Sequence, residues 1–192
     1  MYGKSHTLTD CCIEPNSPLN PKTEYGKSKL RAEIELQKVM DGSMLLSIIR
    51  PPSVYGYGCR GDLFKRYEKI AMLMPWIPKC EMSCLQGLLF IDNLCNVVHA
   101  LIKGRREGTY HPQDRKLLST SEILREIRIQ KGKNCRVSRY LGKVISLCSF
   151  FSIYSKLFGA VSYSELFFQR ELLECAMLTT HDGLRKMYRS EK

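Results

Sequence analysis

The chain has 192 residues, the size of a single domain or of one domain with part of a second. Hydrophobic residues make up 44% and charged residues 26%, which argues against a disordered chain because enough apolar surface is present for a core. The net charge of +11 favours an anionic partner (a nucleic acid, an acidic membrane surface or a phosphate-bearing small molecule), although a solvated basic surface accounts for it equally well.

Nine cysteines raise the question of disulfides or zinc. None forms a CxxC pair, and Cys80 and Cys84 have no second Cys/His pair to complete a tetrahedral zinc site. We expect no metal site, and reduced thiols that are mostly buried. The start of the chain lacks the apolar core of a secretion signal, and the longest apolar run, 144–154, is far shorter than the roughly 20 residues of a membrane helix. The sequence thus predicts a soluble, cytoplasmic protein with no transmembrane segment.

The first predicted elements are a loop over 1–20, a helix and a strand. The helix is expected to start at Asn20 and Pro21, which suit the N-cap and the first helical position, and to end near Met40. The apolar run 44–49 is short and bounded by turn residues, so it predicts a strand buried on both faces, as in a parallel sheet. This order is typical of a layered α/β fold.

The remaining elements follow from periodicity and capping signals. In chain order the sequence predicts helix 62–74, strand 88–91, helix 92–103, a helix capped at Ser119 or Thr120 that runs to Arg128, and a mostly helical tail from Val144.

The loop GYGCRG at 56–61 fits the GxGxxG pattern of dinucleotide-binding turns. We interpret it as a substrate loop instead, for two reasons. The preceding strand is expected to end at Arg50, whereas a true motif follows its strand directly. In addition, no clear return strand of a βαβ unit follows.

Tyr25 and Lys29 are the candidate catalytic pair. They stand at i and i+4 of the predicted helix, and their face continues through Ala32, Leu36 and Met40, so we expect it to point inward. A phenol and an ammonium buried together must serve each other or a ligand, because unpaired burial is costly. The ammonium stabilises the phenolate, which makes Tyr25 a candidate general acid/base and Lys29 its electrostatic partner. By spacing alone, an amphipathic helix with a snorkelling lysine is the alternative.

The wider context favours catalysis. Segment 21–33 (PKTEYGKSKLRAE), followed by a predicted strand and by IRPPSVYG at 49–56, closely resembles the extended short-chain dehydrogenase/reductases. It is most similar to the NAD-dependent epimerase/dehydratase branch that contains UDP-glucose 4-epimerase. Weaker similarity continues through FIDNL at 90–94, GTY at 108–110 and STSEI at 119–123, and so covers most of the chain.

This resemblance implies an α/β fold with two regions. Residues 1–56 would be a partial Rossmann-like fold that lacks its N-terminal strands, and 57–192 a mostly helical substrate-binding region. Tyr25 would move a proton to or from a sugar hydroxyl while NAD takes or returns hydride at the same carbon. Lys29 would also bind the nicotinamide ribose, with Pro51 and Pro52 beside the nicotinamide. The residues implied in substrate binding are Ser53, Arg60, Asp62, Leu63 and Gln86.

Relatives build their dinucleotide site from an N-terminal Gly-rich turn and an acidic residue, and neither precedes Tyr25. We therefore expect the chain alone to bind NAD poorly and to be inactive, with a homodimer or a complementing N-terminal half as possible partners. Asp62 and Gln86 also depart from the family pattern near the expected diphosphate. The cations that could compensate are Arg60, Lys65, Arg66 and Lys79.

The sequence predicts the C-terminal part of a sugar-nucleotide epimerase or dehydratase, a UDP-sugar 4-epimerase or 4-keto reductase of polysaccharide or cell-surface glycan synthesis. One alternative is a non-catalytic basic module that binds nucleic acid or an acidic surface. The sequence lacks an aromatic–basic recognition motif, so we expect no nucleic-acid partner. A second alternative is an interaction protein that uses an exposed half-sheet for assembly.

Overall fold

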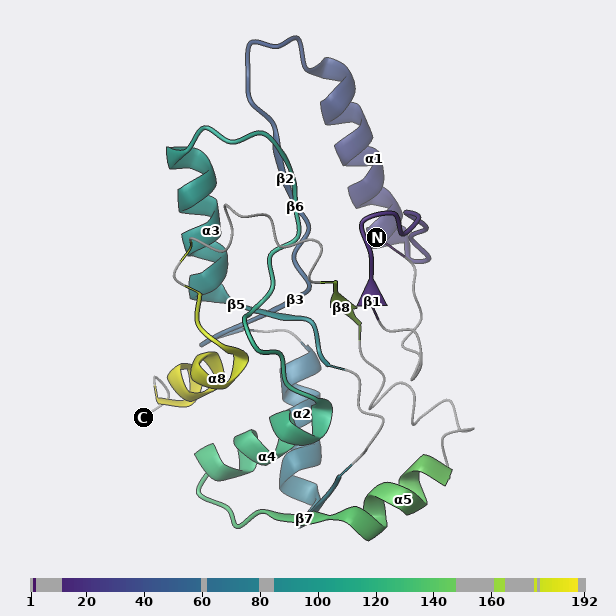
Figure 1. The fold of residues 1–192 in the computed structure, drawn as a ribbon, viewed down its shortest axis with the longest axis vertical. Helices are drawn as coiled ribbons and strands as arrows, with labels where there is room; N and C mark the ends of the chain where they lie inside the picture. Colours follow the sequence, from purple (N-terminus) through teal and green to yellow (C-terminus); the bar gives the residue numbers. More distant parts are fainter. Residues whose placement is uncertain are drawn as a thin grey trace.

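The computed structural model describes residues 2, 12–59, 62–79, 85–147, 161–164, 175 and 177–189. Within them, helices connect and cover short parallel strand pairs, which confirms the predicted α/β class (Figure 1). The strands are β1 (Cys12–Ile13), β2 (Ser47–Ile49), β3 (Ser53–Tyr55), β4 (Trp76–Pro78), β5 (Leu88–Phe90), β6 (Gly108–Tyr110), β7 (Arg136–Ser138) and β8 (Ser162–Tyr163). The helices are α1 (Glu24–Val39), α2 (Asp62–Leu73), α3 (Ile91–Lys103), α4 (Thr120–Gln130), α5 (Arg139–Leu147) and α8 (Thr180–Arg189).

Each strand pairs with one distant in sequence. β1 pairs with β8, β2 with β6, β3 with β5, and β4 with β7, all in parallel. Parallel pairing requires a crossover, so every pair brings together segments separated by at least one helix. The proposed division into residues 1–56 and 57–192 stays a prediction.

Helix starts show how local signals compete. The predicted start of α1 at Asn20 and Pro21 is wrong, because Thr23 is the N-cap and its side chain accepts a hydrogen bond from the Gly26 N–H. For α4 the prediction is confirmed. Ser119 caps the helix and Glu122 returns the bond to the Ser119 backbone, a complete capping box.

β2 is a parallel strand, as predicted, but the prediction that both of its faces are buried is wrong. Only Ile48 of the strand is buried, while Met44 and Leu45 lie outside it and are 63% and 49% exposed. Within the described part of the chain β2 pairs with β6 alone, so nothing there covers its other edge.

Both reasons for rejecting a dinucleotide turn at 56–61 are also wrong. β3 lies directly before Gly56, and it pairs in parallel with β5 after the crossover through α2. The two prolines therefore bend the chain into a new strand rather than a long loop. A Cβ on Gly56 would lie 2.5 Å from the Ile91 Cγ2 atom, so packing against α3 requires this glycine. The role of the loop as a substrate loop stays a prediction.

The described part of the tail contains the end of α5 and all of α8, as expected, with the short strand β8 between them; much of the tail from Val144 lies outside the described residues. One prediction is corrected in the described part of the chain. Of its free cysteines only Cys175 is buried, so burial of most thiols is wrong there. None of the described helices is long and apolar enough to cross a membrane, and no described cluster of His, Cys, Asp or Glu could hold a metal ion.

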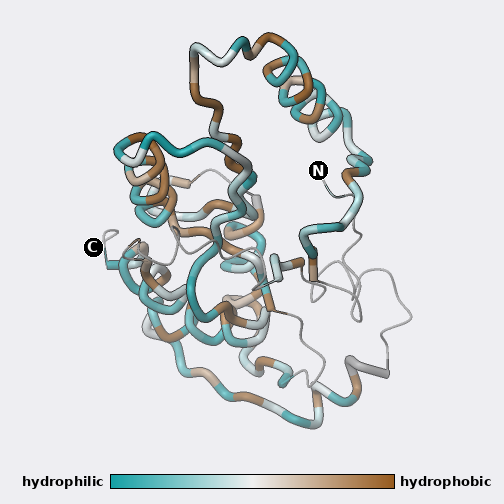
Figure 2. Tube along the Cα trace, turned by 45° about the horizontal axis from the view of Figure 1, so that its top comes forward, coloured by the Kyte–Doolittle hydropathy of each residue, from teal (hydrophilic) through white to brown (hydrophobic). Residues whose placement is uncertain are grey.

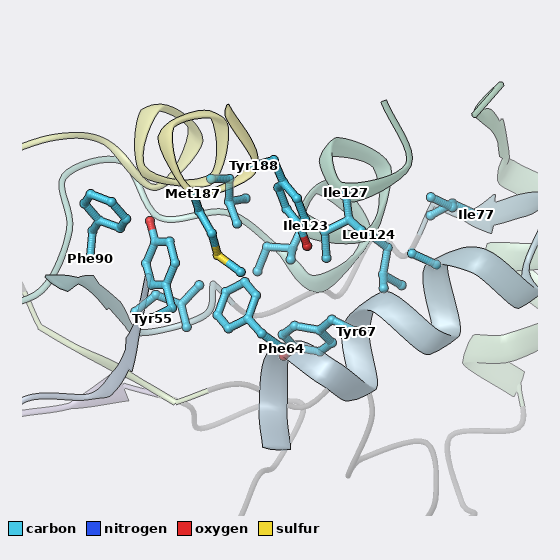
Figure 3. Packing of buried hydrophobic residues seen from close by; sticks show 13 residues of the cluster. Tyr55, Phe64, Tyr67, Ile77, Phe90, Ile123, Leu124, Ile127, Met187 and Tyr188 are labelled. Carbon is cyan, nitrogen blue, oxygen red and sulfur yellow. The ribbon is translucent and has the colours of Figure 1, made fainter. Parts of the chain in front are cut away.

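The main hydrophobic core lies where α2, α4 and α8 pack against the β3–β5 pair (Figure 3). Tyr55 stacks on Phe64 with ring centroids 4.9 Å apart, which joins β3 to α2. A smaller cluster packs α3 against β5 and β6 through Leu89, Val97 and Tyr110. The core residues that are almost fully buried are Tyr55, Ile77, Leu88, Leu89, Val97, Ile123, Leu124, Ile127 and Leu184.

Asp114 is the polar centre of this core and is only 1% exposed. Its Oδ2 accepts a hydrogen bond from the Tyr55 hydroxyl at 2.7 Å, and its Oδ1 accepts from the Phe90 N–H at 2.8 Å and the Asn93 side-chain amide at 2.7 Å. Burial raises the pKa of the Asp114 carboxyl, and these hydrogen bonds oppose that rise. One carboxyl thus joins β3, β5 and α3.

We expect Asp114→Ala to lower the free energy of unfolding by about 3 kcal/mol or more, because the Phe90 N–H loses its buried acceptor and Tyr55 and Asn93 each lose one of two. Chemical denaturation measures this. The control Asp92→Ala removes an exposed carboxylate that pairs with Lys186, and should cost less than about 1 kcal/mol. Equal losses in the two variants would contradict the central role of Asp114.

Candidate active site

The Tyr25–Lys29 pair shares one face of α1, as predicted. The Lys29 Nζ atom lies 5.5 Å from the centroid of the Tyr25 ring. The expectation that this face points inward is wrong, because Tyr25 is 73% exposed, Ala32 and Leu36 are exposed too, and α1 buries only Gly26. Figure 2 shows α1 standing apart from the rest of the described chain, with apolar and polar residues alternating along it. No described element covers the Tyr25 face.

An ion pair fastens α1 to the end of β2. The Arg50 Nη2 atom lies 2.6 Å from Glu33 Oε2, and Arg50 Nε donates to the same carboxylate. The two side chains are only 14% and 13% exposed. Glu33 follows Lys29 by four residues, so the ion pair lies on the Lys29 side of α1. Arg50 directly precedes 51–53, the segment predicted to lie beside nicotinamide and sugar.

Arg50 is held by further buried polar groups. Its Nη1 atom donates to the Tyr2 hydroxyl at 3.0 Å, and that hydroxyl in turn lies 2.6 Å from His111 Nε2. Burial, and then the charge of Arg50, lower the pKa of His111 to about 4. A neutral His111 can accept the Tyr2 proton, so a directed chain of hydrogen bonds runs from Arg50 through Tyr2 to His111.

A cavity of about 450 Å³ opens beside β3. Four residues predicted to bind cofactor or substrate line it together: Pro52, Ser53, Leu63 and Gln86. They come from β3 and the residue before it, from the first turn of α2 and from the segment before β5. The full lining is Ile13, Pro52, Ser53, Leu63, Arg66, Tyr67, Gln86, Gly87, Val161, Ser162 and Tyr163.

The walls of this cavity are fixed by close backbone contacts. The Gln86 side-chain amide donates to Thr120 Oγ1 at 2.8 Å, and the Gly87 N–H donates to the Val161 carbonyl at 3.0 Å. A Cβ on Gly87 would lie 2.5 Å from that carbonyl oxygen, so glycine is required here. The Tyr163 hydroxyl donates to the Arg50 carbonyl at 2.9 Å, which connects the cavity wall to the α1 ion pair.

Other predicted site residues stand elsewhere. Tyr25, Lys29 and Pro51 do not line the cavity. Arg60 lies outside the described residues, and so does the side chain of Asp62, the first residue of α2. Their roles stay predictions.

Some cavity residues were missed from the sequence. Arg66 was considered only as a compensating cation, although it follows Leu63 by three residues and so shares its side of α2. Residues 161–163 reach the cavity because β8 pairs with β1, and no motif in the sequence signals that pairing.

Comparisons with known proteins found similarity to sugar-nucleotide epimerases. The curated UDP-glucose 4-epimerase of Vibrio cholerae is 28% identical over 130 residues, which are 66% of this chain and 40% of that protein. Two Bacillus cereus structures have a similar fold: UDP-N-acetylglucosamine 4-epimerase (TM-score 0.64, 16% identity) and UDP-glucuronic acid 4-epimerase in complex with NAD (TM-score 0.63, 15% identity). They match over 96% and 98% of this chain and 60% and 57% of their own. No family model matches the chain.

The chain is thus similar in sequence to a UDP-glucose 4-epimerase and similar in fold to other sugar-nucleotide epimerases. It spans well under two thirds of the length of these relatives, and the solved structures, at such low identity, establish the fold alone. The resemblance carried by YGKSK and RPPSVYG is thereby confirmed, together with a Rossmann-like fold that is present in part.

The described residues fit this family's cofactor only in part. Tyr25 and Lys29 present a hydroxyl and an ammonium on an open face that could meet a nicotinamide ribose. The Gly-rich loop after β3 is a poor cradle for a pyrophosphate, because the space over Gly56 is filled by Ile91. The described part of the chain therefore offers no complete dinucleotide site.

Proposed function

We propose that the chain forms the substrate-binding and acid/base part of an NAD-dependent sugar-nucleotide epimerase or dehydratase. The observation that carries this proposal is the cavity beside β3, which gathers Ser53, Leu63 and Gln86 from three segments far apart in sequence. Each was assigned to substrate from family resemblance alone. Their meeting in one cavity is not required by the fold class.

The cavity chemistry suits a nucleoside diphosphate sugar. Arg66 supplies a cation for phosphate, and Ser53 supplies a hydroxyl. An apolar and aromatic wall, which a sugar or base can pack against, is formed by Ile13, Leu63 and Tyr67. A volume of about 450 Å³ falls in the usual range for small-molecule sites, and suits part of such a ligand.

Tyr25 and Lys29 are proposed as the catalytic pair. In this proposal the Tyr25 hydroxyl takes a proton from a sugar hydroxyl or returns it, with the Lys29 ammonium beside the ring as its electrostatic partner. NAD, when bound, supplies the hydride acceptor. We propose that it binds on the open face of α1, held largely by groups outside the described residues, with Pro51 and Pro52 near the nicotinamide.

The reaction we propose is either UDP-sugar 4-epimerisation or 4-keto reduction. We also propose a cytoplasmic location and a role in polysaccharide synthesis. A complementing N-terminal half or a second copy would complete the dinucleotide site. The competing non-catalytic basic module gains no support from the comparisons, since the matches named above are all sugar-nucleotide epimerases.

We expect UDP to bind the chain, and Arg66→Gln to weaken that binding by roughly tenfold or more, because a charged hydrogen bond to phosphate is lost. Isothermal titration calorimetry with UDP measures both. Lys65→Gln, the matched control on the next residue, should leave the affinity unchanged because Lys65 is exposed and does not line the cavity. Absence of UDP binding, or equal weakening by both substitutions, would overturn the cavity assignment.

In an assembly that supplies the dinucleotide site, we expect Tyr25→Phe to lower kcat about 10²–10⁴-fold, the usual contribution of a general acid/base. The KM for the UDP-sugar should stay nearly constant, since Tyr25 does not line the cavity. Tyr140→Phe, which changes an exposed tyrosine of α5, is the control and should have no effect. A raised KM with unchanged kcat would reduce Tyr25 to a structural or binding role.

A further inference from the structure

The positive charge of the chain is concentrated in one stretch. Residues 127–164 contain seven lysines and arginines and no aspartate or glutamate, which amounts to +7 of the net +11. Neither the substrate cavity nor the Tyr25–Lys29 pair uses this charge. Its described part includes β7 and α5.

β7 and α5 expose large apolar side chains among these cations. Tyr140 is 76% exposed, Val137 46% and Val144 41%. Trp76 of the neighbouring strand β4 is 45% exposed, and the Arg136 guanidinium lies 5.3 Å from the centroid of its ring. In the β4–β7 ladder Trp76 pairs with Arg136 and Ile77 with Val137, so Trp76 and Val137 face opposite sides of the strand pair. We therefore restrict the name β7–α5 surface to the outward side of α5, directly after β7; its members are Arg139, Tyr140, Lys143 and Val144.

A glycine contact sets which side of α5 faces outward. A Cβ on Gly142 would lie only 1.9 Å from the Lys79 carbonyl oxygen, so α5 lies directly against the chain after β4 at this residue. Side chains of a helix are about 100° apart, so Tyr140 and Val144, two residues to either side, project roughly opposite Gly142. Arg139 and Lys143, both exposed, flank them on one side.

The β7–α5 surface is remote from the proposed catalytic pair. Figure 1 shows α5 and β7 at the lower end of the molecule and α1 at the upper end, with α2 and α4 beside β7. A partner on this surface would leave α1 open.

We propose that the β7–α5 surface binds an anionic lipid bilayer. Arg139 and Lys143 flank Tyr140 and Val144 on the outward side of α5, which is the pattern of a segment that lies in the membrane interface. The ring of Tyr140 suits the headgroup level, and Arg139 and Lys143 attract acidic lipid. The exposed Val144 favours a bilayer over a nucleic acid, because bases stack on aromatic rings and gain little from aliphatic side chains.

Vesicle co-sedimentation of the whole 192-residue chain tests this proposal. We expect binding to vesicles of phosphatidylcholine with one quarter phosphatidylglycerol, weaker binding at high salt, and little binding to pure phosphatidylcholine. Arg139→Gln with Lys143→Gln should reduce the partition coefficient roughly thirtyfold, since each basic residue near an acidic membrane surface contributes about fivefold. Tyr140→Ser should reduce it about tenfold through lost apolar burial.

The matched control is Lys22→Gln with Arg31→Gln, which removes two exposed charges at the α1 end. It should change the partition coefficient by no more than about twofold, because those charges lie far from the bilayer. Equal losses in the two double variants would show general electrostatic attraction and overturn the proposal. So would unaltered binding of Tyr140→Ser, absence of vesicle binding, or tighter binding to a random DNA duplex than to the acidic vesicles.

Discussion

The ion pair between Glu33 and Arg50 is the interaction on which the proposed active site depends. α1 carries the proposed catalytic pair but buries a single residue, so apolar packing within the described chain contributes little to its position. A largely buried ion pair is costly unless its remaining hydrogen-bonding groups are satisfied. Here the Tyr2 hydroxyl accepts from the guanidinium, and the Tyr163 hydroxyl donates to the Arg50 carbonyl. The ion pair thus belongs to a hydrogen-bond network, and these bonds offset the cost of burying its charges at the end of β2.

The same network joins the two halves of the site. Arg50 leads directly into Pro52 and Ser53 on the cavity rim, and Tyr163 forms part of the cavity wall. A shift of α1 would therefore be transmitted through Arg50 to the residues proposed to hold the sugar nucleotide. By contrast, the hydrophobic core reaches the cavity through Tyr67, which belongs to both, and Asp114 bonds to β3, β5 and α3 rather than to α1. Polar contacts thus hold α1 and Arg50, and apolar packing supports the α2 wall of the cavity.

Local signals in the sequence predicted much of this arrangement. The Ser119 capping box, the parallel strand at Ile48 and the shared face of Tyr25 and Lys29 follow from short-range rules, and family resemblance brought Ser53, Leu63 and Gln86 together. The exposure of the α1 face could not be predicted from periodicity, because periodicity identifies an amphipathic face but not what covers it. The Glu33–Arg50 pair, the Asp114 centre and the contribution of Tyr163 depend on contacts between residues far apart in sequence, and no spacing rule encodes them.

Hydrogen exchange of the α1 amides tests the central claim most directly, with Glu33→Ala compared with Glu35→Ala. Glu35 is an exposed glutamate that pairs only within α1, with Lys38. The account predicts that Glu33→Ala speeds exchange across α1 at least about tenfold, because a largely buried charge loses its partner and the helix loses its attachment. Exchange in α2 and α4 should stay unchanged, and Glu35→Ala should resemble the parent chain. Equal exchange of α1 in the two variants would contradict the account.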